Sequence, residues 1–473
     1  MQWRRTVSTT NFNYDTQEIW QKDKDHHIHP WTDFPSFKEK GSMILAESEG
    51  SYVYDSEGKK YLDGIAGLWC VNVGYGRDEI AQAMADQARR MTYYSSFGPH
   101  TSIPAAELAA KLAELTPGDL NHVFFGTGGS MANDTAIRII HFYFNQLGKP
   151  TKKNMITRHD GYNGSTYAAM TLTGVAFDHQ GFDLAPGLVE RISNPNPYRK
   201  PEGMSDADFL DSLVKEFEDK ILELGPNNVA ALFAEPVMGA GGVIVPPEGY
   251  HKRMLEVCRK YDMLYVADEV VTAFGRLGHF FASEDVFGMV PDIIVSAKGL
   301  SSAYAPLSAT ILSKGVYDVI SVPQCEGGMF THGFTYSGHP VCCAAGLKNI
   351  EIMEREDICG HVRKVGPYLE EKLQTLHDLP IVGDVRGKSF MMCVENVANK
   401  ETKELLPAEA HVGDRIADAC EAKGVLVRPI AHLNVMSPPL VLTTDQIDFM
   451  VDTLRQGIVE TQDALVRDGY KIA

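Results

Sequence analysis

Two residues capable of chemistry stand at the ends of apolar segments. Lys298 follows "DIIVSA" (292–297), and Asp268 follows "MLYVA" (263–267). A lysine that loses hydration beside an apolar strand has a lowered pKa, and its neutral amine can attack a carbonyl group. A buried carboxylate needs a cationic partner to stay ionised. An exposed loop lysine and a turn-capping aspartate are the ordinary alternatives.

A third feature is the glycine-rich stretch "GTGGS" (126–130), which follows the apolar "HVFF" and precedes a helical pattern. Free backbone N–H groups at the start of a helix favour an anion, typically a phosphate. Neither GxxxxGK[ST] nor GxGxxG occurs here. Together the three features suit a ligand with a phosphate, a ring nitrogen that pairs with a carboxylate, and an aldehyde that reacts with an amine. Pyridoxal 5′-phosphate (PLP) has all three.

These residues need elements to position them, and the sequence alternates strand-like and helix-like segments. The predicted strands are 122–126, 154–158, 228–236, 263–270 and 292–298, and the predicted helices are 79–91, 104–116, 130–147 and 251–262. This alternation indicates an α/β fold with a parallel sheet covered by helices on both faces. Ligands bind beyond the carboxyl ends of such strands, where Lys298 and Asp268 lie.

The N-terminal and C-terminal parts of the chain have a different pattern of predicted strands and helices. Short strands with turns are expected within 44–63, and helices around 340–376 and 408–423 alternate with short strands. We therefore predict a large domain over 71–335 and a smaller α+β domain formed by 1–70 and 336–473.

Composition excludes several classes of protein. The chain has 473 residues, of which 44% are hydrophobic, and a formal charge of -18, which argues against nucleic acid and leans towards small cationic substrates. The sequence contains no run of about 18 apolar residues, so we expect no membrane-spanning segment. The eight cysteines form no CxxC pair, and the N-terminus lacks a signal-peptide pattern, so we expect a cytoplasmic protein without a membrane partner.

A cluster of histidines, His26, His27 and His29, lies near the N-terminus. Metal binding is conceivable there, but no carboxylate or further histidine stands at a usual ligand spacing. We expect a polar segment and no metal site.

Two segments, "LYVADEVVTAFGRLG" (264–278) and "PDIIVSAKGLSSAYAPLSA" (291–309), resemble class III aminotransferases of PLP fold type I. The ω-amine, ω-amino acid and putrescine:pyruvate transaminases are the most similar branch. The resemblance runs from "HPWTDF" (29–34) and "LDGIAGLWCVNVGYG" (62–76) to "GVLVRPI" (424–430). It implies a mostly parallel sheet of the seven-stranded type and a homodimer, or a tetramer, with shared active sites.

The resemblance also implies roles for individual residues. Lys298 is similar to the Schiff-base lysine that shuttles the proton, and Asp268 to the partner of the pyridine nitrogen. The further cofactor-binding residues that it implies are Gly129, Ser130, Tyr162, Glu235, Val270 and Thr335. Tyr162 and Val270 correspond to the two side chains that enclose the ring, and Thr335 to a threonine that reaches the neighbouring subunit's phosphate.

For the substrate, the resemblance implies contacts from Trp31, Trp69, Tyr162 and Arg428. Both tryptophans have an equally good alternative as core or interface residues. Arg428 resembles a mobile arginine that binds the carboxylate of pyruvate. Ala240 stands where relatives that use ornithine or 4-aminobutyrate carry a glutamate that pairs with this arginine.

Three positions depart from the family pattern: Gly128 and Met131 near the phosphate helix, and Asn163 where a histidine is usual. We expect these departures to change cofactor affinity and substrate range and to leave the chemistry unchanged.

The predicted function is ping-pong transfer of an amino group from an ω-amine, diamine or ω-amino acid to pyruvate, giving an aldehyde or ketone and alanine. One alternative is a 4-aminobutyrate/2-oxoglutarate-type transaminase. Another is a different fold-type-I reaction, such as that of an aminomutase or decarboxylase. A third is a small-molecule-binding protein that uses only the glycine turn. The sequence does not identify the amine.

Overall fold

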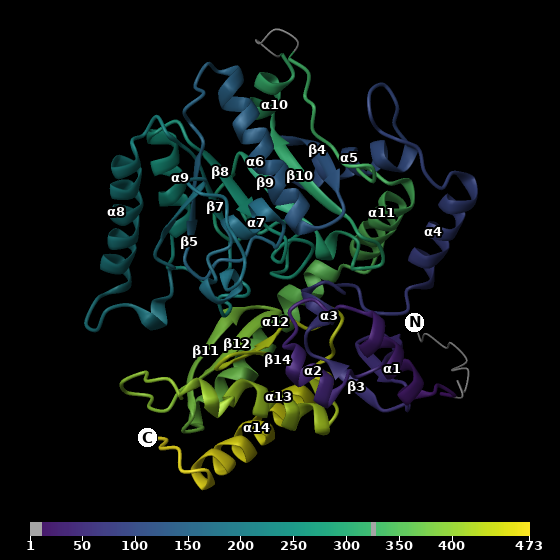
Figure 1. Cartoon of the computed structure of the whole chain (residues 1–473), viewed down its shortest axis with the longest axis vertical. Coiled ribbons are helices and arrows are strands. Elements are labelled where there is room, and N and C mark those ends of the chain that lie inside the picture. Colours follow the sequence, from purple (N-terminus) through teal and green to yellow (C-terminus); the bar gives the residue numbers. More distant parts are fainter. Residues whose placement is uncertain (1–11, 323–327) are drawn as a thin grey trace.

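The computed structural model describes residues 12–322 and 328–473, which form two lobes (Figure 1). The larger lobe is built around a seven-stranded sheet with the order β4-β10-β9-β8-β7-β5-β6. The strands are β4 (Leu120–Gly126), β5 (Asn154–Arg158), β6 (Val189–Ile192), β7 (Val229–Ala234), β8 (Leu264–Asp268), β9 (Ile293–Ser296) and β10 (Ser308–Ser313). Only β10 runs antiparallel to its two neighbours among these strands, so the prediction of a mostly parallel sheet is confirmed.

Both faces of this sheet are covered by helices, and β7 shows how. Every residue of β7 is buried. Leu232 belongs to the hydrophobic cluster that includes Phe217 of α8 (Asp206–Leu224) and Met254 of α9 (Tyr250–Lys260). Phe233 belongs to the cluster that includes Ile140 of α6 (Gly129–Gln146). Successive strand residues point to opposite faces, so the continuous apolar run reflects burial on both sides.

The remaining helices of the larger lobe lie beside the sheet and around its edges (Figure 1). They are α4 (Asp78–Arg90), α5 (Ile103–Leu115), α7 (Tyr167–Leu172), α10 (Lys314–Ile320) and α11 (Pro340–Arg355). The predicted helices 79–91, 104–116 and 130–147 correspond to α4, α5 and α6, each displaced by one residue. Such an offset is within the uncertainty of helix ends.

The smaller lobe joins the two ends of the chain. The antiparallel strands β1 (Leu45–Glu49), β2 (Tyr52–Asp55) and β3 (Lys60–Asp63) form a sheet with β13 (Val425–Leu426), in which Val425 pairs with Leu62. The predicted association of N-terminal strands with the C-terminal part is therefore confirmed. The domain boundaries at 70/71 and 335/336 stay a prediction.

A second sheet of this lobe has the order β11-β12-β15-β14. Its strands are β11 (Val382–Lys388), β12 (Met391–Asn396), β14 (Arg428–Ile430) and β15 (Leu433–Met436), and it is packed with α12 (Ile358–Gln374), α13 (Val412–Ala422) and α14 (Thr444–Arg467). The N-terminal segment adds α1 (Thr16–His26) and α2 (Phe34–Lys40), and α3 (Ala66–Trp69) leads out of β3. None of the helices in the described ranges is long and apolar enough to cross a membrane.

Several predicted boundaries differ from the structure, and two of these differences concern the helical region 340–376 and the strand before Lys298. The helical region 340–376 is divided into α11 and α12, because Asp357 adopts a left-handed conformation (φ 47°) and caps α12 through the N–H of Gly360. The strand predicted over 292–298 ends at Ser296, and Lys298 begins a short 3-10 turn over Lys298–Leu300. The lysine therefore belongs to the connection beyond the strand.

Candidate active site

Lys298 and Asp268 lie at the carboxyl ends of neighbouring parallel strands. In the β8–β9 ladder Asp268 is paired with Val295, three residues before Lys298. Lys298 has a backbone φ of 43°, a conformation that costs a non-glycine residue free energy and is concentrated at functional sites. Its amine forms no hydrogen bond or ion pair with any described residue. Burial lowers the pKa of Lys298, and the charges of Cys70, Asp268 and Glu235 counteract this only in part. The amine is therefore biased towards its neutral, nucleophilic form.

The carboxylate of Asp268 is buried, with 4% of the residue exposed. Its Oδ2 accepts hydrogen bonds from Nδ2 of Asn133 at 2.8 Å and Nδ2 of Asn163 at 2.7 Å, and Oδ1 accepts the N–H of Val270 at 3.2 Å. Burial raises the pKa of Asp268, and these hydrogen bonds oppose that rise. No ion pair to Asp268 exists among the described residues, so the site offers a buried carboxylate to a ligand's cation.

Asn163, which departs from the family pattern, has a clear part in this arrangement. Its side-chain amide donates directly to Asp268, and its backbone N–H donates to Oγ1 of Thr173 at 2.9 Å. The amide keeps the hydrogen bond to the carboxylate without adding a titratable ring. The second donor, Asn133, lies on α6 and was not singled out by sequence, because its proximity to Asp268 depends on how α6 crosses the sheet.

The predicted phosphate-binding residues lie at the start of α6. The first N–H groups of a helix have no intrahelical acceptor and attract anions. A Cβ added to Gly129 would stand 3.1 Å from Val270, and one added to Gly164 (φ 125°) would stand 2.8 Å from Cα of Ser130. Oγ of Ser130 also accepts the N–H of Ser165 at 3.1 Å. The start of α6, Val270 and the Tyr162–Ser165 loop therefore form one cradle.

Glu235 positions the Tyr162–Ser165 loop through a hydrogen bond to its backbone. It is 6% exposed; its Oε1 accepts the N–H of Tyr162 at 3.0 Å and its Oε2 the N–H of Gly239 at 2.8 Å. Burial, together with the negative charge of Asp268, raises the pKa of Glu235 to about 7. Since both oxygens are engaged by the backbone, Glu235 acts here through Tyr162. Its predicted contact with the cofactor stays a prediction.

The predicted substrate residues have different surroundings. Trp31 is 58% exposed, and its ring meets that of Tyr162 edge-on with centroids 6.0 Å apart. Trp69 is 5% exposed and belongs to a hydrophobic cluster with Leu277 and Met391. Trp69 is thus buried, and Oε2 of Glu235 and Trp69 both adjoin Gly239. The predicted contact of Trp69 with the substrate stays a prediction.

Arg428, on β14, forms no hydrogen bond or ion pair within the described ranges. Burial lowers its pKa, and Tyr162 is near enough to oppose that shift. Arg428 in turn acts electrostatically on Lys298. The guanidinium is therefore close to the cradle and has no carboxylate partner, in line with alanine at position 240.

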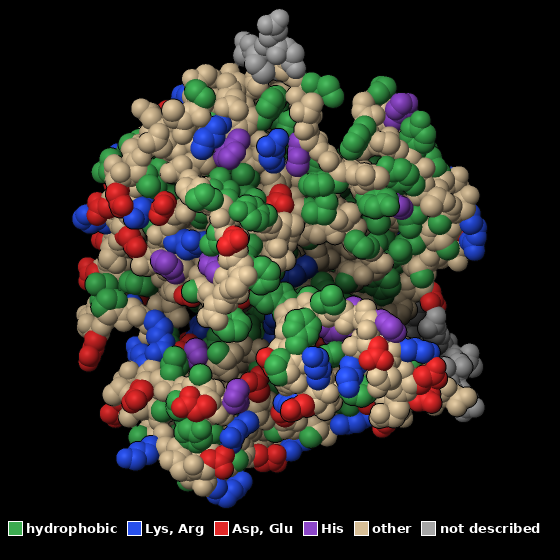
Figure 2. Space-filling view, in the orientation of Figure 1, with side chains coloured by type: hydrophobic (Ala, Val, Ile, Leu, Met, Phe, Trp, Pro, Cys, Tyr) green, Lys and Arg blue, Asp and Glu red, His purple; other side chains and the backbone are tan. Residues whose placement is uncertain are grey.

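Thr335 is not joined to the other predicted site residues by any hydrogen bond in the described part of this single chain. Its side chain is exposed, and its backbone oxygen accepts the hydroxyl of Tyr93 at 2.5 Å. Exposed apolar side chains, including Tyr94, Phe97 and Tyr336, occur on neighbouring segments. Figure 2 shows such side chains gathered on the side of the larger lobe near α4 and α5, and a hollow between the two lobes.

Asp178 was missed by sequence reasoning. Gly174 donates its N–H to the oxygen of Gly161 at 2.6 Å, which ties the segment before Asp178 to the residue before Tyr162. Asp178 is partly buried, and its charge acts on Tyr162. Burial raises the pKa of Asp178, and its carboxylate has no hydrogen bond or ion pair in the described ranges. Only the tertiary fold reveals it, because a single aspartate in a short 3-10 turn (Ala176–His179) has no sequence signature.

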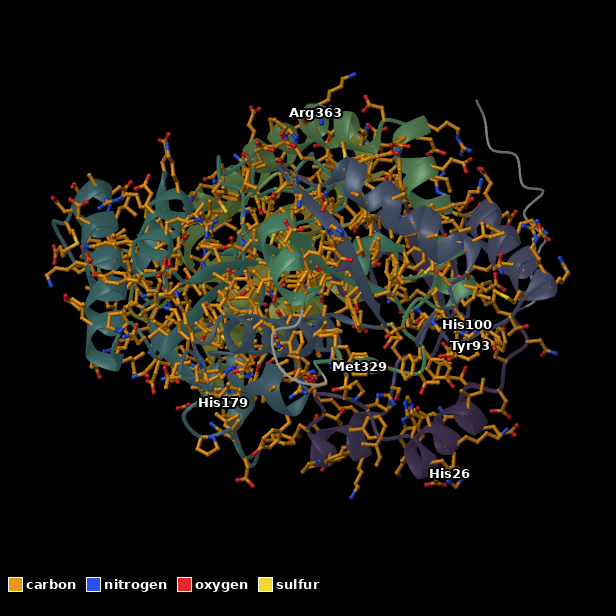
Figure 3. All side chains as sticks on the ribbon, turned by 90° about the horizontal axis from the view of Figure 1, so that it is seen from above. His26, Tyr93, His100, His179, Met329 and Arg363 are labelled. Atoms are coloured by element: carbon orange, nitrogen blue, oxygen red, sulfur yellow. The ribbon has the colours of Figure 1, made fainter. Side chains whose placement is uncertain are left out.

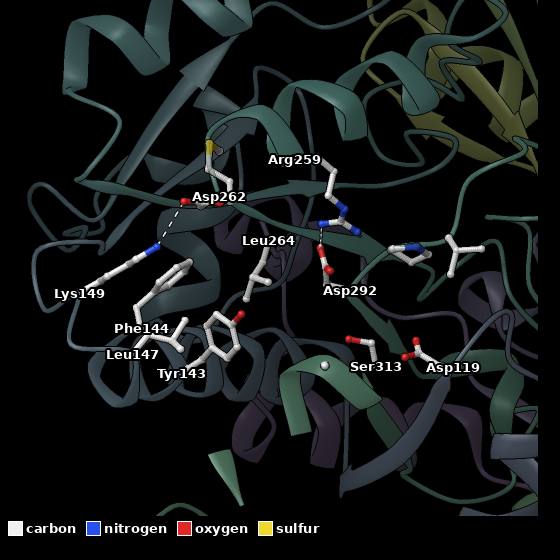
Figure 4. Close-up of a pocket in the computed structure, with 14 residues that line it drawn as sticks. Asp119, Tyr143, Phe144, Leu147, Lys149, Arg259, Asp262, Leu264, Asp292 and Ser313 are labelled. Atoms are coloured by element: carbon white, nitrogen blue, oxygen red, sulfur yellow. Dashed lines mark hydrogen bonds and ion pairs between the residues drawn. The ribbon is translucent and has the colours of Figure 1, made fainter. Parts of the chain in front are cut away.

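A separate hollow of about 580 Å³ lies at the opposite edge of the sheet (Figure 4). Its lining includes Leu264, the first residue of β8, and Asp292, which precedes β9. Four of its charged groups are paired, Arg259 with Asp292 at 2.7 Å and Lys149 with Asp262 at 3.3 Å. It is distinct from the site at the carboxyl ends of these strands.

The residues at the carboxyl ends fit PLP by their donor chemistry. A buried carboxylate without a cation, an amine without a partner and a helix start beside a small-residue cradle match the ring nitrogen, the aldehyde and the phosphate. Fold and site thus define a PLP-dependent enzyme.

Comparisons with known proteins agree. The sequence profile described as "Aminotransferase class-III" matches residues 36–458, so the chain belongs to the class III aminotransferases, whose cofactor is PLP. It is 42% identical over 456 residues to the putrescine–pyruvate aminotransferase of Pseudomonas aeruginosa, covering 96% of this chain and 98% of that protein. It is 40% identical over 423 residues to the mitochondrial gamma-aminobutyrate transaminase 1 of Oryza sativa subsp. indica, covering 89% and 82%.

A solved structure leads to the same family. The omega transaminase of Pseudomonas jessenii in complex with PMP superposes with a TM-score of 0.92 at 38% identity, covering 94% of this chain and 98% of that one. The predicted fold class, enzyme class and cofactor are therefore confirmed.

Proposed function

We propose that this aminotransferase moves an amino group from an ω-amine, with a diamine as the preferred donor, to pyruvate by a ping-pong mechanism. The observation that carries the choice of pyruvate is Arg428, a partly buried guanidinium near Tyr162 that has no carboxylate partner in the described ranges. An unpaired guanidinium in a partly desolvated site binds a carboxylate strongly and in a defined orientation.

When bound, PLP supplies an aldehyde for the donor amine and a ring that stabilises negative charge at the donor carbon. The start of α6 with Gly129 and Ser130 would hold the phosphate, and Tyr162 and Val270 would enclose the ring. Asp268 would face the ring nitrogen and keep it protonated.

The amine of Lys298 would move the proton. In the first half-reaction Nζ takes a proton from the carbon that bears the donor's amino group. In the second half-reaction Nζ delivers a proton to the carbon that was the carbonyl carbon of pyruvate, which gives alanine. The lowered pKa of Lys298 supports this role, because the neutral amine is the base.

The preference for a diamine is supported by Asp178. Its unpaired, partly buried carboxylate near Tyr162 would attract the second ammonium group of a diamine and would repel the carboxylate of an ω-amino acid. The relative that is a putrescine–pyruvate aminotransferase supports the same donor class.

A second candidate is a 4-aminobutyrate/2-oxoglutarate-type transaminase, which the Oryza sativa relative favours. In that case Arg428 would bind a carboxylate of a five-carbon acceptor. The donor would carry a carboxylate beside Asp178, which is electrostatically unfavourable.

The experiment is to supply the PLP-loaded enzyme with putrescine or 4-aminobutyrate, each with pyruvate or 2-oxoglutarate, and to measure alanine and glutamate. We expect putrescine with pyruvate to be the fastest pair by at least about tenfold. If 4-aminobutyrate with 2-oxoglutarate is faster, the second candidate replaces the first. If no pair gives an amino acid, transamination of this substrate class is wrong.

We also propose a homodimer in which Thr335 reaches the partner's phosphate site, supported by its exposure and by the apolar side chains around it. A cytoplasmic location is likewise a proposal; the seven cysteines within the described ranges are all free thiols.

A further inference from the structure

A cluster outside the active site brings together two imidazoles and a carboxylate near the end of α1. Oδ1 of Asp23 lies 2.9 Å from Nδ1 of His27 and 2.9 Å from Nε2 of His29. All three ligand atoms lie within 4.8 Å of one another. Asp23 and His27 are neighbours because they are four residues apart at the end of a helix, and the chain then turns so that His29 returns to the same carboxylate.

The ligand types suit a borderline transition-metal ion such as Zn²⁺. Such ions bind imidazole nitrogen and carboxylate oxygen at about 2.0–2.2 Å, so neighbouring ligand atoms in a tetrahedral site are about 3.3 Å apart. The two nitrogen–oxygen distances of 2.9 Å are already close to that value. His27 is exposed, so its ring can adjust towards an ion and the remaining positions stay open to water.

The side chains around the cluster hold two of the ligands in place. Oγ of Ser42 donates to Oδ2 of Asp23 at 2.5 Å, which fixes the carboxylate; Oδ2 also lies 2.9 Å from Nε2 of His29. The ring of His29 lies against that of Phe37, with centroids 4.8 Å apart. Oγ1 of Thr32 donates to the backbone oxygen of His29 at 3.0 Å. Supporting contacts of this kind orient ligands and raise metal affinity.

We propose that Asp23, His27 and His29 form a binding site for one divalent transition-metal ion, with Zn²⁺ as the chemical type. This replaces the expectation of a metal-free polar segment. The ion fixes the turn that leads directly into Trp31, whose ring meets that of Tyr162. The metal site is therefore an anchor for the N-terminal segment beside Tyr162.

The test is calorimetric titration of Zn²⁺ into the PLP-loaded enzyme, prepared without a histidine tag and freed of chelators and unbound PLP. His27→Ala/His29→Ala removes two ligands. His26→Ala is the matched control, because His26 is the adjacent exposed histidine and takes no part in the cluster (Figure 3). We expect one ion per chain in the wild type and in His26→Ala, and at least a tenfold weaker affinity in the double variant.

Asp23→Asn serves as a second variant if the double variant does not fold, since the amide keeps a hydrogen-bonding oxygen but loses the charge; we expect at least a fivefold loss of affinity. X-ray absorption at the zinc edge then identifies the ligands, and two imidazoles per ion are expected. Equal affinities in the wild type and a folded cluster variant would overturn the site. So would a spectrum without imidazole, or a wild type that binds no Zn²⁺.

Discussion

The two central residues of the site differ in how firmly the protein holds their side chains. The carboxylate of Asp268 is immobilised by three hydrogen bonds inside the protein, whereas the amine of Lys298 has no partner among the described residues and extends from a strained backbone position. A group that binds one fixed atom of a ligand gains from immobility. A group that carries a proton between positions must be free to move. The difference in support matches the difference in the proposed roles.

We predict that Lys298→Ala abolishes turnover, with a loss of at least about 10⁴-fold in kcat, because no other described amine adjoins Asp268 to move the proton. Activity is measured as alanine formation. Lys252→Ala removes an exposed lysine of α9 and is the matched control, expected to retain normal activity. Near-normal turnover in Lys298→Ala would remove Lys298 from the mechanism.

For Asp268→Asn we expect a loss of about a thousandfold or more in kcat/KM. The amide is nearly isosteric but carries no charge to keep a ring nitrogen protonated, and charge placed at the reacting system is among the largest contributions to catalysis. The spectrum of bound PLP should change in parallel. An unchanged spectrum together with normal kinetics would contradict the assignment.

Asp178→Asn tests the preference for diamines. We expect kcat/KM for putrescine to fall roughly fivefold, because a partly solvated charge pair contributes ~1 kcal/mol to binding. The value for a monoamine of the same chain length should change little. Asp183→Asn, an exposed aspartate of the same loop, is the control. A loss of equal size for both amines would show that Asp178 does not act on the distal ammonium.

At the scale of elements, Arg276 joins the connection after β8 to the smaller lobe. It is fully buried, and burial lowers its pKa to about 9. Its guanidinium donates to the backbone oxygens of Phe390 at 3.1 Å and Pro438 at 2.5 Å and to Oδ1 of Asn72 at 2.8 Å. One side chain therefore satisfies acceptors from three segments that are far apart in sequence.

Arg276→Leu should destabilise the protein by about 3 kcal/mol or more, because buried acceptors that lose their donor pay their desolvation cost. The denaturant midpoint, followed by circular dichroism, measures the loss. Arg467→Leu, at the exposed end of α14, is expected to change stability by less than about 0.5 kcal/mol. If both variants unfold at the wild-type midpoint, Arg276 does not hold the lobes together.

The elements that sequence predicted best are those whose residues are apolar on both faces. β7, β8 and β9 were recognised for this reason. β10 was not, because Ser308, Thr310 and Ser313 interrupt its apolar residues, although all of its residues are buried. These hydroxyl groups can be buried only where a hydrogen-bond partner is present. Oγ1 of Thr310, for example, donates to the backbone oxygen of Ala132 at 3.0 Å.

The site residues also differ in whether the sequence alone could identify them. Lys298 and Asp268 could be found from their positions after apolar segments, but Asn133, which donates to Asp268 from α6, could not. Asp23 lies on α1, a helix that the polar sequence did not reveal, so its spacing to His27 could not be recognised as one helical turn. Asp178 becomes noticeable only when the Gly161–Gly174 contact is known.

At the scale of the whole molecule, the candidate site lies where the lobes meet. Lys298 and Asp268 come from the larger lobe and Arg428 from the smaller one, and the N-terminal segment contributes Trp31. Thr335 is the exception, since it lies on an exposed segment and contacts Tyr93. One exposed residue that lies apart from the others fits the proposed symmetric dimer with shared sites.

Mixed dimers test this arrangement directly. One chain carries Lys298→Ala and the other Thr335→Ala, and two different affinity tags allow the mixed species to be isolated. If Thr335 serves the partner's site, one of the two sites in the mixed dimer contains both native residues. We then expect about half of the wild-type activity, well above that of either mutant homodimer. If Thr335 serves its own chain, each site carries one substitution, and activity cannot exceed half that of the Thr335→Ala homodimer. A single-chain mass at working concentration would exclude sharing altogether, because no partner would be present to bring Thr335 to the phosphate.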